Sequence, residues 1–269
     1  MNSSASGDRG IRLIATDLDG TLLNTTGELS GRNAAALKRA QTAGLVVVLV
    51  TGRPVRMVLP LARSLNLHGH VICTNGAATH RLPDGESEDA RGIALDVLRS
   101  VVPRLRQAIP DVGFALEYGD RVVRERVLRD DPESVADILS ALTPEYPPAL
   151  KLIARSAAHD THALNALINT LAAGQLEATS SGANFSEVAA WGVNKGYALT
   201  RLYRSLGLEA AQCLAFGDAH NDLPMFGCVG MSVTMRNAPA EVQRAASQVT
   251  ASNDEDGVAL VIEALLGVG

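Results

Sequence analysis

The chain has 269 residues, of which 46% are hydrophobic and 20% charged, and its formal net charge at neutral pH is −5. This length exceeds one typical domain, and the composition is that of a globular protein that buries a full core. The net negative charge and the lack of a basic run argue against binding of nucleic acid through its phosphates. No apolar stretch has the length that spans a membrane, so we expect neither nucleic acid nor a membrane as a partner.

The N-terminal residues and the cysteines bear on location in the cell. Residues 1–10 are rich in Ser and Gly and lack the apolar segment of a signal peptide, so we expect a disordered tail. By their spacing, Cys73, Cys213 and Cys228 form neither a metal-ligand pair nor a disulfide framework. Both features favour a reducing, cytoplasmic location.

The first predicted strand, residues 11–15, is short and mostly apolar, and it leads directly into the run from Asp17 to Thr21. Ligands of open α/β sheets bind beyond the carboxyl ends of such buried strands, which is where Asp17 and Asp19 stand. Two residues apart on an extended chain, their carboxylates point the same way, and their repulsion requires a cation or a shared proton nearby. The structural alternative is an Asx-turn in which these residues only shape the loop.

Helices and strands then alternate along the chain. Ser30 is expected to cap a helix over 31–43, which is followed by a strand over 45–50, a helix over 54–65 and a strand over 71–74. This βαβαβ order predicts right-handed crossovers and a mostly parallel sheet. The turn Thr51-Gly52-Arg53-Pro54 offers a hydroxyl, an unobstructed amide and a helix start that favours anions.

The pattern changes after the turn that begins at Leu82. The next predicted elements are strands at 112–118, 121–125 and 149–154, helices at 132–142 and 161–172, and two short strands between 177 and 188. Strand pairs that alternate with helices predict a separate α+β layer. We therefore expect an inserted domain over residues 83–190, and a core made of residues 11–82 and 191–269.

Two more polar clusters follow when the core resumes. Asn194-Lys195-Gly196 opens a helix that runs to residue 206, and Lys195 stands where the helix dipole disfavours a cation, which suggests a buried anionic partner. A strand over 213–216 then leads into the segment from Gly217 to Asp222. Like the earlier turns, this segment follows an apolar strand directly.

Together these motifs resemble, in order and spacing, the four motifs of the haloacid dehalogenase-like phosphohydrolases. The matching segments are Asp17 to Thr21 for the first motif, Thr51 for the second, Lys195 for the third and Gly217 to Asp222 for the fourth. The segments 73–77, 233–242 and 253–259 resemble the Cof-like branch of this family, which carries a large α/β cap. Arg236 departs from that branch, where a small residue usually precedes the Asn-Ala pair.

The resemblance implies an α/β fold with a Rossmann-like, doubly wound parallel sheet as its core and an inserted α+β cap. It also implies Mg²⁺-dependent hydrolysis of small phosphomonoesters, such as sugar phosphates, nucleotides or cofactor phosphates. The expected partner is thus a small phosphorylated metabolite, and the cap, which closes over the leaving group, chooses among them. The polar cap residues near predicted strand ends are Glu117, Tyr118, Arg124, Lys151, His159, Asn184 and Glu187.

The resemblance also implies a role for each motif residue. Asp17 is the nucleophile that becomes an aspartyl-phosphate and a Mg²⁺ ligand, and Asp19 is the general acid and base whose backbone carbonyl also binds the metal. Asp218 is the third metal ligand, and Asp222 orients Lys195 or a water on the metal. The phosphoryl oxygens are held by Leu18, Thr51, Gly52, Lys195 and Asn221.

Structural roles and other functions stay open at this point. Thr51 fits a strand-end hydroxyl, Lys195 a solvated charge, and Asn221 and Asp222 the cap of the next helix. Arg53 fits either the scaffold or a substrate contact, and we expect His220 at the rim of the site. A phosphomutase would use the same two aspartates. A protein that binds a phosphate ligand without catalysis usually carries a broken motif, and none of the four motifs is broken here.

Overall fold

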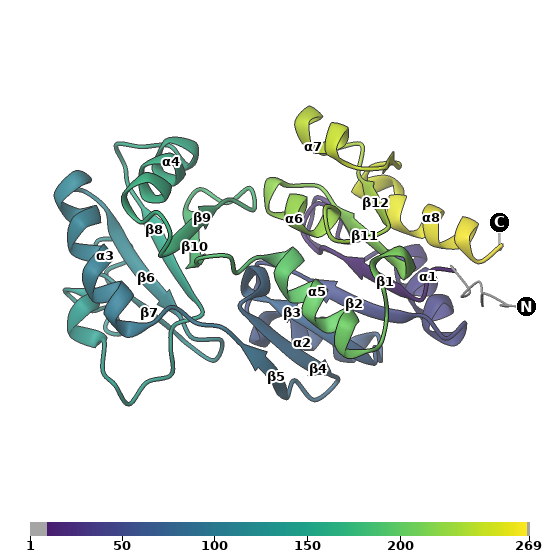
Figure 1. Cartoon of the computed structure of the whole chain (residues 1–269), viewed down its shortest axis with the longest axis horizontal. Helices are drawn as coiled ribbons and strands as arrows, with labels where there is room; N and C mark the ends of the chain where they lie inside the picture. The colour runs from purple at the N-terminus through teal and green to yellow at the C-terminus, as the bar shows by residue number, and fades with distance from the viewer. Residues whose placement is uncertain (1–9, 268–269) are drawn as a thin grey trace, which may run out of the picture.

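The computed structural model describes residues 10–267, which form two units that lie side by side along the longest axis of the molecule (Figure 1). The first and last elements of the chain both belong to the larger unit, and the smaller unit is inserted between them. The expected tail over residues 1–10 lies almost wholly outside the described residues. Within residues 10–267, no helix combines the length and apolar character needed to cross a bilayer.

The larger unit, the core, is built on an eight-stranded sheet with the order β13-β12-β11-β1-β2-β3-β4-β5. Neighbouring strands from β13 to β3 are parallel, and β4 and β5 join antiparallel at one edge. The strands are β1 (Leu13–Thr16), β2 (Val46–Val50), β3 (Gly69–Cys73), β4 (Ala78–Leu82), β5 (Ser87–Ala90), β11 (Cys213–Gly217), β12 (Met231–Thr234) and β13 (Gln248–Val249).

Helices cover both faces of this sheet, because side chains alternate along its buried strands. On β1, Ile14 packs into one hydrophobic cluster with Leu37 and Val258, whereas Leu13 packs into a second cluster with Leu199 on the other face. The first face carries α1 (Gly31–Thr42), α2 (Val55–Ser64) and α8 (Gly257–Leu265), and the second carries α5 (Lys195–Ser205), α6 (Leu223–Phe226) and α7 (Ala240–Ala245). The expected doubly wound, mostly parallel core is confirmed.

Short 3₁₀ turns connect several of these elements. Their bounds are η1 (Thr74–Gly76), η2 (Ile138–Ala141), η3 (Ala210–Gln212), η4 (His220–Asp222) and η5 (Asn253–Glu255).

The predicted N-terminal cap of helix α1 is also present, because the hydroxyl of Ser30 accepts a hydrogen bond from the backbone amide of Asn33 at 3.0 Å.

The smaller unit, the cap, is a five-stranded antiparallel sheet with the order β7-β6-β8-β10-β9. Phe114, Leu152 and Val188 point from this sheet into a hydrophobic cluster with two helices. The alternate residues along the same strands turn to the opposite face, toward the core. The elements are α3 (Leu95–Ala108), β6 (Gly113–Glu117), β7 (Val122–Arg124), β8 (Lys151–Arg155), α4 (Thr161–Leu171), β9 (Leu176–Thr179) and β10 (Ser186–Ala190).

One difference from the sequence prediction concerns the boundary of the cap at residue 83. Strand β5 pairs with β4, so Ser87–Ala90 extends the core sheet, and the chain leaves this sheet after Ala90. The turn that follows Leu82 therefore closes a hairpin within the core. Turn residues mark the end of a strand equally well in a hairpin and at a domain boundary.

Two helices of the cap also differ from prediction. The helix expected over 132–142 is wrong: this segment holds only the short turn η2, and the backbone amide of Ile138 donates to the buried carboxylate of Glu125 at 2.8 Å. Helix α3 was not predicted, although Leu98, Val102 and Leu105 form its buried face. Pro103 lies inside α3 and interrupts the sequence pattern of a helix.

A glycine fixes the packing of α5 against α6. A Cβ atom on Gly196 would lie 2.1 Å from the carbonyl oxygen of Pro224. A Cβ atom on Gly31, at the start of α1, would meet no atom of the described residues within 4 Å. The two positions are both helical, so they form a matched pair.

We expect Gly196→Ala to lower the free energy of unfolding by about 1–3 kcal/mol, as overpacking does. This effect outweighs the roughly 1 kcal/mol by which alanine favours a helix over glycine. Gly31→Ala, which gains helix propensity without a clash, should be neutral or stabilising. Chemical denaturation of both variants measures the difference, and a Gly196→Ala protein as stable as the wild type would contradict this packing.

Candidate active site

The polar turns that follow three core strands meet at one edge of the sheet. Strand β1 pairs in parallel with β2 on one side and with β11 on the other, so their carboxyl ends lie together. Asp17, Thr51 and Asp218 follow these ends directly. The chain runs from β1 to β2 on one side of β1, and after the cap it returns to the core with β11 on the other side. The carboxyl ends of these strands therefore form a topological switch point, where open α/β sheets bind ligands.

Lys195 lies at the centre of a buried group of charges. Its Nζ donates to Oδ1 of Asp17 at 2.6 Å and to Oδ1 of Asp222 at 2.7 Å, and its side chain is 1% exposed. The side chain of Asn194 caps α5 by accepting from the amide of Tyr197 at 2.9 Å, which fixes the start of the helix. Lys195 thus has the buried anionic partners that its position suggested, and the solvated alternative is wrong.

Asp222 holds both Lys195 and the loop after β11. Its Oδ1 accepts from Lys195, and its Oδ2 accepts from the backbone amides of Asp218 and Ala219, each at 3.0 Å. The residue is fully buried. Because both oxygens are occupied, Asp222 orients its neighbours from behind the site.

Asp218 is held close to the turn after β1. The hydroxyl of Thr21 donates to Oδ1 of Asp218 at 2.8 Å. Gly20 lies beside it with a φ of 78°, and a Cβ atom there would come within 2.3 Å of Oδ2 of Asp218. Glycine is therefore required at position 20 both for its backbone conformation and for this close approach.

The carboxylates of this site outnumber its ammonium. Asp17, Asp218 and Asp222 offer oxygen atoms that lie within 4.8 Å of one another, and together with Lys195 they form what we call the charge cluster. Burial, with the nearby charges of Asp222 and Asp218, raises the pKa of Asp17 well above its usual range. Burial is also the main cause that raises the pKa of Asp218 to about 6.

The surplus of negative charge fits a divalent cation. Burial acts to lower the pKa of Lys195, but its attraction to Asp17 and Asp222 raises it, so the ammonium stays charged. A single ammonium leaves most of the carboxylate charge uncompensated. Carboxylate oxygens are the ligands that Mg²⁺ prefers, and this ion binds through one or two of them.

Asp19 lies apart from the charge cluster. Its side chain is 50% exposed and accepts hydrogen bonds from Arg53, at 2.8 Å from Nε and also from Nη2. Asp17 and Asp19 thus point to different partners, and Arg53, whose role the sequence left open, holds the second carboxylate. The side chain of Asp19 therefore does not belong to the charge cluster.

Of the residues expected to bind phosphoryl oxygens, Gly52 and Asn221 line a cavity together with Asp17. The buried hydroxyl of Thr51 accepts from the backbone amide of Arg53 at 3.1 Å. Leu18 packs its side chain into the core, and its carbonyl oxygen accepts hydrogen bonds from the backbone amides of Thr21 and Leu23. The amide nitrogen of Asn221 donates to Oδ1 of Asn75 at 3.1 Å.

Sequence reasoning did not select Asn75 as a site residue. It lies in the turn η1 after β3, a fourth strand end beside the other three, and has a left-handed backbone with a φ of 56°. An Asn-Gly pair directly after a predicted strand was the available signal. His220, half-exposed and paired with Glu241, lies at the rim as expected, and Arg236 forms a surface ion pair with Glu255 at 3.2 Å.

Two cations join the cap to the core. Lys151 of β8 donates from Nζ to the carbonyl oxygen of Gly52 at 2.9 Å and to the carboxylate of Glu187 on β10. Arg56 of α2 donates to both oxygens of Glu117 on β6, at 2.5 and 2.8 Å, and to the carbonyl of Gly119 at 2.7 Å. The polar face of the cap sheet therefore closes directly over the Thr51 turn.

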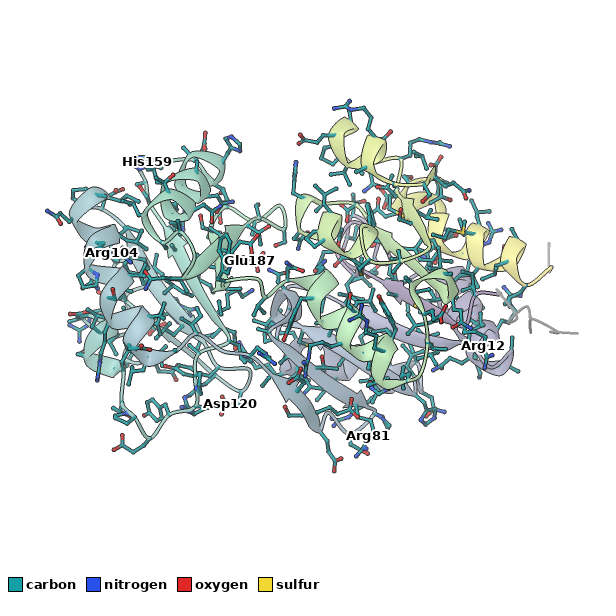
Figure 2. The ribbon with its side chains drawn as sticks, in the orientation of Figure 1. Arg12, Arg81, Arg104, Asp120, His159 and Glu187 are labelled. Carbon is teal, nitrogen blue, oxygen red and sulfur yellow. The ribbon has the colours of Figure 1, made fainter. Side chains whose placement is uncertain are left out.

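A cavity of about 260 Å³ lies between these contacts. Its walls include Asp17, Asp19 and Arg53 from the core and Glu117, Lys151 and Glu187 from the cap. The other polar cap residues singled out from the sequence are not among its lining residues; they are Tyr118, Arg124, His159 and Asn184. His159 lies at the outer end of the cap, away from the core (Figure 2).

Known proteins share this arrangement over most of the chain. The 5-amino-6-(5-phospho-D-ribitylamino)uracil phosphatase YwtE of Bacillus subtilis is 30% identical over 311 residues, with 95% of this chain and 98% of the relative covered. The similarly named YcsE of the same organism is 31% identical over 258 residues, covering 95% and 96%. BT1666 of Bacteroides thetaiotaomicron, a phosphatase of the haloalkanoate superfamily, matches with a TM-score of 0.83 and 25% identity over 99% of this chain and all of that one.

A family model agrees with these similarities. The model for haloacid dehalogenase-like hydrolases matches residues 14–262, which include the core strands, the cap and every motif described above. The resemblance inferred from the motifs is confirmed. The chain belongs to the haloacid dehalogenase-like hydrolases, as an enzyme of their Cof-like branch.

Proposed function

We propose that this enzyme is a Mg²⁺-dependent phosphatase that hydrolyses small phosphomonoesters through an aspartyl-phosphate on Asp17. The observation that carries the proposal is the charge cluster, in which one buried ammonium orients a carboxylate at the wall of a cavity. The names of the relatives support phosphatase activity. A cytoplasmic location is part of the proposal and rests on the free cysteines.

Asp17 is the nucleophile in this proposal. Lys195 holds Oδ1, so we assign Oδ2 to the attack on phosphorus. The new Oδ2–P bond forms as the bond from phosphorus to the leaving oxygen breaks, and this divides one difficult displacement into two easier ones. The ammonium of Lys195 compensates the negative charge on the phosphoryl oxygens during both steps.

The acidic residues have two further roles in the proposed mechanism, metal binding and proton transfer. Asp17 and Asp218 would hold Mg²⁺ through their carboxylates and Asp19 through its carbonyl. When bound, the ion supplies positive charge that reduces the repulsion between Asp17 and the phosphate. Asp19 donates a proton to the leaving oxygen and later removes one from the water that hydrolyses the aspartyl-phosphate.

Neutral groups complete the phosphoryl site. Thr51, the amides of Gly52 and Leu18, and the side chain of Asn221 hold the phosphoryl oxygens. Residues 91–190 act as a cap that closes over the leaving group and excludes water, with residues 10–90 and 191–267 as the core. Lys151 and Arg56 stabilise the closed arrangement.

We expect Asp17→Asn to lower phosphatase turnover by roughly three orders of magnitude or more, because the covalent route is lost. Release of inorganic phosphate from p-nitrophenyl phosphate measures it, and circular dichroism checks that the fold is intact. Asp130→Asn, which changes an exposed cap carboxylate, is the control and should keep full activity. More than about a tenth of wild-type activity in Asp17→Asn would contradict covalent catalysis.

Activity should vanish in a chelator and return with Mg²⁺. Ca²⁺ should support activity poorly, because its larger and looser coordination shell misaligns the attack. Asp218→Asn should raise the Mg²⁺ concentration for half-maximal activity by roughly tenfold or more. The assay is titration of the metal-free enzyme with each ion, and full activity in chelator would exclude the role given to Asp218.

Lys195→Ala should lower the activity on every phosphate ester by a similar factor, roughly 10²–10³, because the phosphoryl group is common to all of them. Lys151→Ala should instead change the ranking of substrates, since Lys151 faces the leaving group. His159→Ala, at the outer end of the cap, is the control. The turnover of a panel of phosphate esters by each variant measures both effects. A Lys195→Ala enzyme with a changed ranking of substrates would contradict the separate roles of Lys195 and Lys151.

A further inference from the structure

The turn η1, which follows strand β3 at the edge of the sheet, has an unusual backbone. Thr74 and Asn75 have φ angles of 55° and 56°, and Gly76 follows with a φ of 99°. This left-handed region is uncommon for residues other than glycine, and a β-branched residue such as Thr74 is a true outlier there. Strained backbone of this kind persists only where the surrounding structure holds it, and it is concentrated at functional sites.

The backbone of this turn is fixed to the second motif. The amide of Asn75 donates to the carbonyl oxygen of Thr51 at 3.0 Å, and the amide of Thr74 donates to the carbonyl oxygen of Arg53, also at 3.0 Å. These two acceptors flank Gly52 in the sequence. The left-handed turn therefore holds the segment that is expected to bind phosphoryl oxygens.

The same turn lies against the start of α5. A Cβ atom on Gly76 would lie 2.2 Å from the carbonyl oxygen of Asn194 and 3.1 Å from the backbone nitrogen of Lys195. Any side chain at position 76 would therefore displace the end of the helix that carries Lys195. The turn is thus in contact with the third motif as well.

The side chain of Asn75 reaches the fourth motif. Its Oδ1 accepts a hydrogen bond from Nδ2 of Asn221 at 3.1 Å, and the two residues are only 4% and 5% exposed. Asn221 lines the cavity that contains Asp17, whereas Asn75 is not among the residues that line it. The carboxamide of Asn75 can therefore act on this cavity only through Asn221.

The cap encloses the same carboxamide from the other side. A Cβ atom on Gly52 would lie 3.1 Å from Oδ1 of Asn75 and 3.2 Å from Oε1 of Glu187, so both side chains lie against this glycine. Burial acts to raise the pKa of Glu187, but the ammonium of Lys151 and the carboxamide of Asn75 are among the groups that lower it. Figure 2 shows Glu187 on the side of the cap that faces the core. The carboxamide thus lies between Asn221 of the core and Glu187 of the cap.

We propose that Asn75 is a positioning residue for phosphoryl transfer, which directs the amide group of Asn221 toward the phosphoryl oxygens. This role rests on the proposed phosphatase function and deepens it. The terminal torsion of an asparagine is broad and nearly two-fold, so a free Asn221 could turn its oxygen toward the phosphoryl group and repel it. Asn75 accepts from one of the two N–H groups of Asn221, which leaves the second N–H for a phosphoryl oxygen.

This role also explains why position 75 holds an asparagine. The backbone there is left-handed, and asparagine is among the few residues other than glycine that adopt this conformation readily. Glycine meets the backbone requirement but has no carboxamide. Asn75→Gly therefore removes the contact with Asn221 and leaves the backbone contact with Thr51 in place.

We expect Asn75→Gly to lower kcat for p-nitrophenyl phosphate with Mg²⁺ by roughly 10–100-fold, the loss that follows removal of a partner that orients a ligand. KM should change by less than about threefold, because the contact acts on the transition state. Asn66→Gly is the matched control, since Asn66 is an exposed residue with a φ of 49°. It should keep the wild-type kcat.

The double variant Asn75→Gly/Asn221→Ala tests whether Asn75 acts through Asn221. Asn221→Ala alone should lower kcat at least as much as Asn75→Gly, and the double variant should lose less than about a further threefold. A general role of Asn75 in the fold would instead multiply the two losses. Multiplied losses, or a wild-type kcat in Asn75→Gly, would overturn the assignment.

Failure of the proposed function has a different signature, namely no hydrolysis of any phosphomonoester by the wild type with Mg²⁺. Calorimetric titration with inorganic phosphate in the presence of Mg²⁺ then decides, because this ion presents the same oxygens as a phosphoryl group. Binding that is at least roughly tenfold weaker in Asn75→Gly and unchanged in Asn66→Gly supports the positioning role. Equal affinity in Asn75→Gly and the wild type, or no binding by the wild type, refutes it.

Discussion

The contact between the Lys195 ammonium and the buried carboxylates is the constraint on which the rest of the site depends. Without Lys195, Asp17 and Asp222 would be buried unpaired, a condition that usually destabilises a fold by several kcal/mol. Even with Lys195, the charge cluster keeps a surplus of negative charge. Because burial raises the pKa of Asp218 to about 6, the folded chain binds this proton more tightly than the unfolded chain, and stability falls as the pH rises from about 4 to about 6.

The fold brings these charges together from distant parts of the sequence. Strand β1 supplies Asp17, the start of α5 supplies Lys195, and the loop after β11 supplies Asp218 and Asp222. Side chains alternate along the strands of the cap sheet. Its apolar face is therefore covered by α3 and α4, and its polar face meets the core. In the proposed function, the core thus positions the residues for phosphoryl transfer, and the cap positions those that contact the leaving group.

Local sequence signals were sufficient to predict much of the fold and of the candidate site. Asp17 and Asp218 were identifiable because each follows a short apolar strand, and the parallel order of those strands determines that their ends meet. The pairing of Arg53 with Asp19 was not predictable, since it depends on the direction in which two exposed side chains turn. Likewise, α3 was not predicted, although its Pro103 is no stronger an interruption than Pro60 in the predicted α2. Strand β5 lacks the apolar pattern of a buried strand because it lies at a sheet edge.

The choice of cap residues illustrates the same limit of local patterns. Glu117, Lys151 and Glu187 reach the cavity because they occupy alternate positions on central strands of the cap sheet. Tyr118 and Asn184 stand near strand ends in the sequence as well, yet they do not line it. The register between β6, β8 and β10 distinguishes the two groups, and register is a property of the paired strands.

Calorimetric titration of the wild type with Mg²⁺ between pH 5 and pH 8 tests the central claim, that a divalent cation balances the charge cluster. Since Mg²⁺ must displace the proton from Asp218, its affinity should fall by about tenfold per pH unit below pH 6 for each proton displaced, and proton release should appear in buffers of different ionisation heat. The affinity should become constant once Asp17, whose pKa burial also raises, has lost its proton. Asp218→Asn should bind weakly and should lose the part of the pH dependence that is centred near pH 6. A wild-type affinity that does not change between pH 5 and pH 8, or no binding at all, would contradict the account.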